Sequence, residues 1–212
     1  MNDKVIEYRG IDSVVIAEIT NDDNEENGGY QFGDVMPLVP AAELTKTVET
    51  STETHYYDNL AAIIIDAEGP DTVGITGAGM DLKTLALIAG RHFDETVGAM
   101  IEGERVTRYF ALGYRTKDTA GNYRYVWRFK GTFAVPEDSF KTIDNSTEAR
   151  GTTLTYTGIH TIHQFTKGKR NGTAWEKGTA KALVVDSGLG KADLTNFFET
   201  VTTPDTLKAK AA

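Results

Sequence analysis

The chain has 212 residues, which is enough for one sizeable domain, and its formal net charge of -9 opposes non-specific binding to nucleic acid. It contains no cysteine, so disulfide bonds and thiol chemistry are excluded. No apolar run approaches the roughly 20 residues that span a bilayer, and the first residues lack the pattern of a secretion signal. We therefore expect a protein synthesised in the cytoplasm that has no membrane segment.

Residue usage predicts a mainly β fold, because Thr, Tyr and Phe are frequent and many apolar positions alternate with polar ones. We expect a single β-sandwich domain spanning residues 11–201, with a short flanking helix and a C-terminal helix. The polar residues 1–10 are expected to form an N-terminal arm. Residues 202–212 contain no core-forming segment and are expected to form a flexible C-terminal tail.

Two segments have the periodicity of an amphipathic helix. The short helix is expected between Asp81, a favourable N-cap residue, and Gly90, which suits a left-handed C-cap. The C-terminal helix is expected to begin near Lys191. The expected apolar stripes are Leu82, Leu85, Ala86 and Ala89 in the first helix, and Leu194, Phe197, Phe198 and Val201 in the second.

The acidic segment at residues 21–29 is expected to be a solvated turn between two strands. A calcium-binding loop is the alternative, because oxygen-bearing side chains recur at nearly the spacing of an EF-hand, with Gly28 in the sixth place. These side chains belong to Asp23, Glu25, Asn27, Gln31 and Asp34. The β-type flanks and the Asp in the last position, where an EF-hand has Glu, favour the turn.

A strand is expected to begin after Pro40, but the Thr/Glu-rich segment Glu49–Thr54 has little to bury. This segment is interpreted either as a mobile loop or as a surface that becomes ordered against a partner. Tyr56 and Tyr57, which follow it, are equally consistent with contact residues and with the start of a buried strand. Two further strands are expected at residues 60–65 and 72–76.

The segment Arg108–Pro136 predicts a long β-hairpin that turns near Gly121. On its return strand, strict alternation predicts an aromatic face against the core and a cationic face directed at solvent or at a neighbour. The aromatic face comprises Tyr123, Tyr125, Trp127 and Phe129, and the other face contains Arg124, Val126, Arg128 and Lys130.

The last third of the chain predicts a strand at Thr152–His163, with a possible bulge at Gly158, and a final strand at Lys181–Val185. His160 and His163 would lie on opposite faces of a strand, so they do not predict a shared metal ion. The basic segment Lys167–Lys177 is interpreted as a solvated or ion-pairing loop.

No motif in the chain predicts catalysis. A nucleophile elbow of the G-x-S-x-G type, a zinc-binding H-E-x-x-H motif and the spacing of a nucleotide-binding glycine loop are all missing from the sequence. We therefore expect no catalytic, cofactor or metal site, and a protein that is not an enzyme.

With these elements in place, the chain resembles the major tail tube proteins of long-tailed bacteriophages, particularly those that infect Gram-positive hosts. The resemblance covers most of the chain and is strongest in the central hairpin, where an ALGYR strand, a Gly-Asn turn and a YRYVW strand follow one another. It is carried by Tyr30–Pro37, Tyr57–Asn59, Asp81–Gly90, Ala111–Arg115, Tyr123–Trp127, Lys130–Gly131, Pro136–Glu137 and Asp193–Phe198.

The resemblance implies a β-sandwich subunit that closes into six-membered rings, which stack into a hollow tube through which DNA passes. It also implies a location in the virion tail, and tape measure, tail terminator or tail-tip proteins as further partners. Candidate inter-subunit contacts are Glu49, Thr54, Tyr56, Tyr57 and Asp58. Because an acidic lining keeps DNA phosphates away, candidate channel-facing acids are Glu18, Asp66 and Glu68.

A monomeric carbohydrate- or ligand-binding β-sandwich is the alternative function. Such a module needs an exposed aromatic platform, and Trp127 with Tyr125 would provide one if their face of the hairpin were open.

Overall fold

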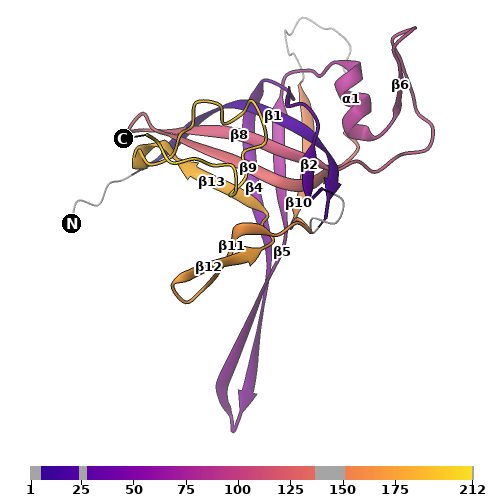
Figure 1. Ribbon diagram of the computed structural model, residues 1–212. Helices are drawn as coiled ribbons and strands as arrows, with labels where there is room; N and C mark the ends of the chain where they lie inside the picture. The colour runs from indigo at the N-terminus through magenta and orange to yellow at the C-terminus, as the bar shows by residue number, and fades with distance from the viewer. Residues whose placement is uncertain (1–5, 24–27, 137–150, 212) are drawn as a thin grey trace, which may run out of the picture.

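The computed structural model describes residues 6–23, 28–136 and 151–211, and these residues form a mainly β fold (Figure 1). The large antiparallel sheet contains β1 (Tyr8–Asp22), β2 (Tyr30–Phe32), β3 (Met36–Pro37), β4 (Ala41–Tyr57), β5 (Leu60–Gly77), β8 (Phe110–Asp118), β9 (Tyr123–Phe133), β10 (Thr152–Ile159) and β13 (Ala182–Asp186). Two small hairpins pair β6 (His92–Asp94) with β7 (Ala99–Ile101), and β11 (Phe165–Asn171) with β12 (Ala174–Gly178). The helical elements are α1 (Leu82–Ala89) and the 3-10 turn η1 (Ser187–Leu189).

The strands of the large sheet follow the order β2-β1-β8-β9-β10-β5-β4, and β3 and β13 pair with β1 and β9. Strand β9 organises the sheet because all of its length is paired. It pairs with β8 on one edge, while its other edge pairs with β13 at residues 124–128 and with β10 at residues 130–133. In Figure 1, β4 and β5 run across the direction of β8 and β9.

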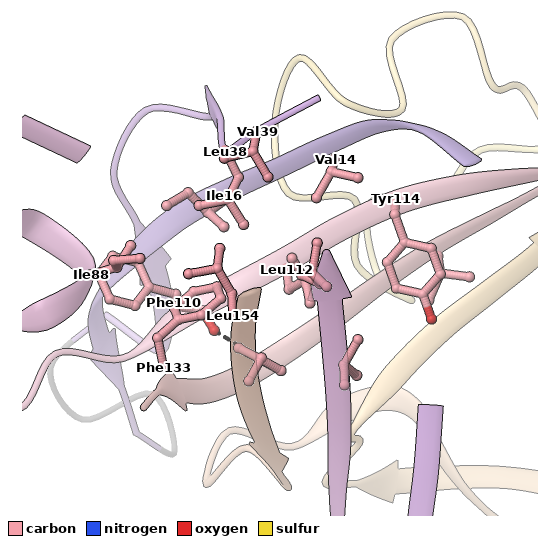
Figure 2. Packing of buried hydrophobic residues seen from close by; sticks show 14 residues of the cluster. Val14, Ile16, Leu38, Val39, Ile88, Phe110, Leu112, Tyr114, Phe133 and Leu154 are labelled. Atoms are coloured by element: carbon pink, nitrogen blue, oxygen red, sulfur yellow. Dashed lines mark hydrogen bonds between the residues drawn. The ribbon is translucent and has the colours of Figure 1, made fainter. Parts of the chain in front are cut away.

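The sheet has a hydrophobic core on each face. One core gathers apolar side chains from β1, β5, β8, β9, β10 and α1, and Ile16, Phe110, Leu112 and Leu154 are among its fully buried members (Figure 2). The other core forms on the opposite face, where the C-terminal segment packs Phe197 and Val201 against Trp127 and Phe129. Burial on both faces produces the layered, sandwich-like architecture that the sequence predicts.

The helix α1 confirms the short predicted helix. The Asp81 carboxylate accepts a hydrogen bond from the Thr84 amide at 2.9 Å, and Gly90 adopts the left-handed conformation (φ 65°) that closes the last turn. Its buried stripe differs from the expected one and consists of Thr84, Ala86, Ile88 and Ala89. Leu82, expected in the stripe, is exposed.

The predicted C-terminal helix is wrong, because the described residues after Lys191 form a series of turns. Phe197 and Val201 are buried as expected. The Asp193 carboxylate accepts hydrogen bonds from the Thr195 amide and hydroxyl at 3.1 and 2.8 Å, an arrangement that competes with helix formation.

The last described residues of the predicted C-terminal tail lie against the residues that follow η1. Ala209 forms a β-bridge with Ala192, and the Lys210 amide donates to the Lys191 carbonyl at 2.9 Å.

Three features of the strands also differ from expectation. Strand β1 begins at Tyr8, inside the predicted N-terminal arm, because it pairs with β8 as far as Asp118. Strand β10 pairs through Gly158 in unbroken register, so no bulge forms there. The basic segment expected to be a loop instead forms the β11–β12 hairpin.

Candidate interaction site

The most prominent surface feature is the distal part of the β4–β5 hairpin, residues 49–68, which we call the extension. Figure 1 shows it projecting away from the rest of the molecule. The Thr/Glu-rich segment, interpreted as a mobile loop or as a surface ordered by a partner, is a strand here. Its antiparallel pairing runs from Thr50 opposite Glu68 to Tyr57 opposite Leu60, with one register shift between His55 and Tyr56. Asp58 and Asn59 form the tip with positive φ angles of 50° and 63°, as in the two-residue turn that matches the twist of a hairpin.

The extension exposes large apolar side chains to an unusual degree. Tyr56 is 68% exposed and Leu60 is 72% exposed, and every large apolar side chain of the extension is at least half exposed. This set consists of Tyr56, Tyr57, Leu60, Ile63, Ile64 and Ile65. A two-stranded hairpin without a packed face is at best marginally stable in water, and large apolar side chains gathered on an exposed surface commonly mark a protein interaction site. The extension therefore has the properties of an interaction element.

The register of the extension gives it two different faces, because cross-strand partners share a face and neighbours alternate. One face contains hydroxyl and acidic side chains, namely Thr50, Thr52 and Thr54 with Glu68 and Asp66, together with Ile64. The opposite face combines Ser51, Glu53 and His55 with Ala67, Ile65 and Ile63. The second face presents an apolar strip along β5 beside a polar strip along β4.

A cluster of charged side chains fixes the point where the extension leaves the sheet. Lys181, next to β13, places its Nζ 2.6 Å from the Glu68 carboxylate and 3.6 Å from Asp71, and it also donates to the Gly69 carbonyl. The hydrogen bond from Lys181 lowers the pKa of Glu68 below its usual value. The register of β4 and β5 shifts between the pairs Val48–Asp71 and Thr50–Glu68. Lys181 therefore contacts β5 at an irregularity in the pairing of the two strands.

The structure brings all five candidate inter-subunit residues together on the extension. Glu49, Thr54, Tyr56, Tyr57 and Asp58 are exposed there. Sequence reasoning missed Ile63, Ile64 and Ile65, because a short apolar run is also what a buried strand looks like.

The three candidate channel-facing acids do not form one group. Asp66 and Glu68 share one face of the extension. Glu18 lies on β1, opposite Phe110, in the body of the sheet. Glu18 pairs with Arg108 at 2.8 Å, and Glu68 pairs with Lys181. Asp66 makes no ion pair with any residue that the structure describes, so of the three acids it alone presents an uncompensated charge.

The prediction for the cationic face of the central hairpin is wrong. Arg128 and Lys130 are buried, and each meets a carboxylate from a distant part of the chain, Asp71 on β5 and Asp22 at the end of β1. Arg128 donates to Asp71, and Lys130 lies 2.6 Å from Asp22. Only Arg124, 3.8 Å from Asp186, stays partly exposed.

The aromatic face is closed as well. Trp127 is fully buried, and its indole N–H donates to the Phe197 carbonyl at 2.9 Å. Tyr125 stacks on Phe198 with ring centroids 5.7 Å apart. These two residues therefore do not form the open platform that the carbohydrate-binding alternative requires. Trp175 on β12 is the tryptophan that reaches solvent.

The described residues contain no group of three or more His, Cys, Asp or Glu side chains arranged to hold a metal ion. The Asp23 carboxylate accepts from the Gly29 amide at 3.0 Å, an arrangement typical of a turn, while Glu25 and Asn27 of the calcium alternative lie outside the described residues. His163 contacts the Asp23 carbonyl and His160 contacts the Thr179 hydroxyl.

Within the described ranges, no helix is long and apolar enough to cross a membrane. Comparison with known proteins identifies no relative: no family model matches the chain, and no curated protein is significantly similar to it.

Proposed function

We propose that this protein is a structural subunit that associates with copies of itself into stacked six-membered rings, forming the tail tube of a long-tailed bacteriophage. The proposal combines the sequence resemblance with one structural observation, namely the extension and its exposed apolar side chains. The rings would form the conduit through which DNA leaves the virion, and tape measure, terminator and tail-tip proteins would contact the ends of the tube.

The extension supports self-association on energetic grounds. Covering its six large apolar side chains would remove surface worth about 25 cal/mol per Å² from water. The extension projects from one side of the subunit (Figure 1), and we propose that it contacts a different surface on the second copy. A contact of that kind generates a closed ring or an open filament. Both outcomes fit a protein that builds a tube.

The charge of the chain supports passage of DNA without binding. A net charge of -9 for each subunit, repeated around a ring, repels phosphates over a Debye length of about 8 Å at physiological ionic strength. Asp66, exposed and uncompensated, is the candidate acid that contributes most directly to such a lining.

The experiment compares the purified wild-type protein with a variant that lacks the extension. In this variant a two-residue Asn-Gly turn replaces residues 51–67, so that Thr50 and Glu68, which face each other across the hairpin, flank a turn type suited to that position. Light scattering would give the mass in solution, and electron microscopy would show rings or tubes.

The wild-type protein is expected to form rings or tubes as its concentration rises, and the shortened variant is expected to remain a folded monomer. A wild-type protein that stays monomeric at millimolar concentration would contradict the proposal. Tubes of normal appearance from the shortened variant would contradict the role of the extension.

A further inference from the structure

The β11–β12 hairpin is a second protrusion, and it has the opposite charge to the extension. Its residues 165–178 carry four cations, Lys167, Lys169, Arg170 and Lys177, against one acid, Glu176. The extension carries five acids, Glu49, Glu53, Asp58, Asp66 and Glu68, and no Lys or Arg. The two hairpins therefore have complementary charges within a chain that is acidic overall. We call residues 165–178 the basic hairpin.

Three of the four cations of the basic hairpin are exposed to a partner. Lys167, Lys169 and Arg170 are exposed, and none of the three forms an ion pair with a residue that the structure describes. Glu176, the one acid of the hairpin, is the cross-strand partner of Lys169, and its carboxylate accepts a hydrogen bond from the Asn171 side-chain amide at 2.9 Å, so four cations face a single acid.

The apolar surface of the basic hairpin lies next to one of these cations. Trp175 is 60% exposed and is the cross-strand partner of Arg170, so the indole and the guanidinium lie on the same face. The extension contains the matching combination, because Glu53 is the cross-strand partner of Ile65 and Ile63 follows on the same face. An acid beside an apolar strip on one hairpin thus corresponds to a cation beside an indole on the other.

We infer that the basic hairpin is the surface that receives the extension of a second copy of this chain, with Glu53 facing Arg170 and the Ile63–Ile65 strip covering Trp175. This inference rests on the proposed function and specifies the contact through which copies associate. Buried Trp and Arg side chains are the residues that most often dominate protein interfaces, and the charge pair would set the register of the contact.

The contact is intermolecular because of the geometry of the subunit. Figure 1 shows the basic hairpin beside the root of the extension, while the extension runs away from it over a length of about 30 Å, given about 3.3 Å per strand residue. Glu53 and Ile63–Ile65, midway along the extension, are exposed, so the basic hairpin of their own subunit does not cover them. Each subunit offers one projecting and one receiving element, which is the arrangement of a head-to-tail assembly.

The first test uses charge reversal. Glu53→Arg and Arg170→Glu are each expected to raise the protein concentration needed for assembly by about tenfold or more, because like charges would then face each other. The double variant Glu53→Arg/Arg170→Glu is expected to restore assembly close to the wild-type concentration. Lys191→Glu changes an exposed cation outside the two hairpins and serves as the matched control. Single reversals that assemble like this control would overturn the inference.

The second test uses the absence of cysteine from the chain. A variant with Glu53→Cys and Arg170→Cys should form a ladder of covalent multimers under mild oxidation, and either substitution alone should not. Tubes that assemble without a ladder would overturn the inference while leaving the proposed function intact. A protein that never assembles would contradict both.

Nucleic acid is the other anionic partner that the basic hairpin might be thought to bind, and it has a distinct signature. Binding of a short single-stranded oligonucleotide that is lost in Arg170→Glu, with assembly of that variant unchanged, would overturn the inference. We expect no such binding at physiological salt, since only a few phosphates would meet cations on a chain with a net charge of -9.

Discussion

The Arg128 guanidinium on β9 donates a hydrogen bond to the Asp71 carboxylate on β5, and both side chains are almost completely buried. The same carboxylate lies 3.6 Å from Lys181 and 3.8 Å from Lys46. Asp71 therefore lies close to three cations, namely Arg128 on β9, Lys46 on β4 and Lys181, which directly precedes β13. Because Asp71 lies at the root of the extension, this cluster joins the projecting element to the body of the sheet.

Removing the Asp71 charge should destabilise the subunit strongly. In Asp71→Asn, Arg128 would stay buried without a counter-ion, and breaking a buried pair in this way costs about 3–5 kcal/mol. Urea denaturation followed by tryptophan fluorescence measures the change. Asp12→Asn is the control, since it removes the partner of Arg115 from a much more exposed pair and should cost about 1 kcal/mol or less. Equal losses in the two variants would contradict this interpretation.

The two tryptophans should behave in opposite ways. Trp127→Ala would empty a fully buried site and remove the hydrogen bond to Phe197, at a cost of about 3–5 kcal/mol in the free energy of unfolding. Trp175→Ala should change this free energy by no more than about 0.5 kcal/mol, because its side chain is exposed. The Trp175→Ala substitution should nevertheless impair assembly.

A stable Trp127→Ala protein that had lost binding to one glycan would favour the carbohydrate-binding alternative.

The N-cap of α1 should make the free energy of unfolding of the protein depend on pH. Hydrogen bonds from Thr84 lower the pKa of Asp81 below its usual value. The stabilisation is therefore fully present above the pKa of the unfolded chain and is lost as the pH falls through the lower folded pKa. Asp81→Ala should cost about 1 kcal/mol at neutral pH.

The variant Asp81→Asn is the control for the effect of pH, because Asn caps a helix without titrating. Thermal melts between pH 7 and pH 3 should show a smaller acid-induced loss for Asp81→Asn than for the wild type. Identical losses would mean that the cap does not contribute to the acid sensitivity of the fold.

Reversing the charge of Asp66 tests the proposal that this residue lines the channel of a tube. Asp66→Lys should leave folding within about 0.5 kcal/mol of wild type, because the side chain is exposed. In assembled tails it should slow the release of DNA, and the delay should shrink as salt rises. Ejection kinetics at two salt concentrations, with Asp66→Asn as the neutral control, measure this effect. An unchanged rate for the Lys variant would show that Asp66 does not face the channel.

The sequence predicted those elements whose signals are local. The hairpin of β8 and β9 followed from strict alternation around the turn at Gly121, and α1 followed from Asp81 and Gly90 at its two ends. The burial of Arg128 was not predictable in the same way, since its counter-ion comes from Asp71, which lies 57 residues away. A cation on a strand indicates a solvent-exposed face unless the distant carboxylate is known.

The two largest errors have different causes. The spacing of Leu194, Phe197 and Val201 is that of a helix, but Asp193 binds the backbone near it and favours a turn. The segment Glu49–Thr54 has no alternation that would identify a strand, because neither face of the extension packs against the body of its own subunit. Its structure comes from pairing with β5, which only the fold reveals.

The order in which the residues of the cluster around Asp71 are synthesised has a consequence for folding in the cell. Lys181 leaves the ribosome about 110 residues after Asp71, which corresponds to roughly 5–20 seconds at common rates of translation. During this interval β4 and β5 exist without Lys181, while Ile63, Ile64 and Ile65 are already exposed. The exposed apolar side chains of nascent chains on neighbouring ribosomes can therefore meet before Lys181 fixes the root of the extension. Binding by molecular chaperones would be most useful during this interval.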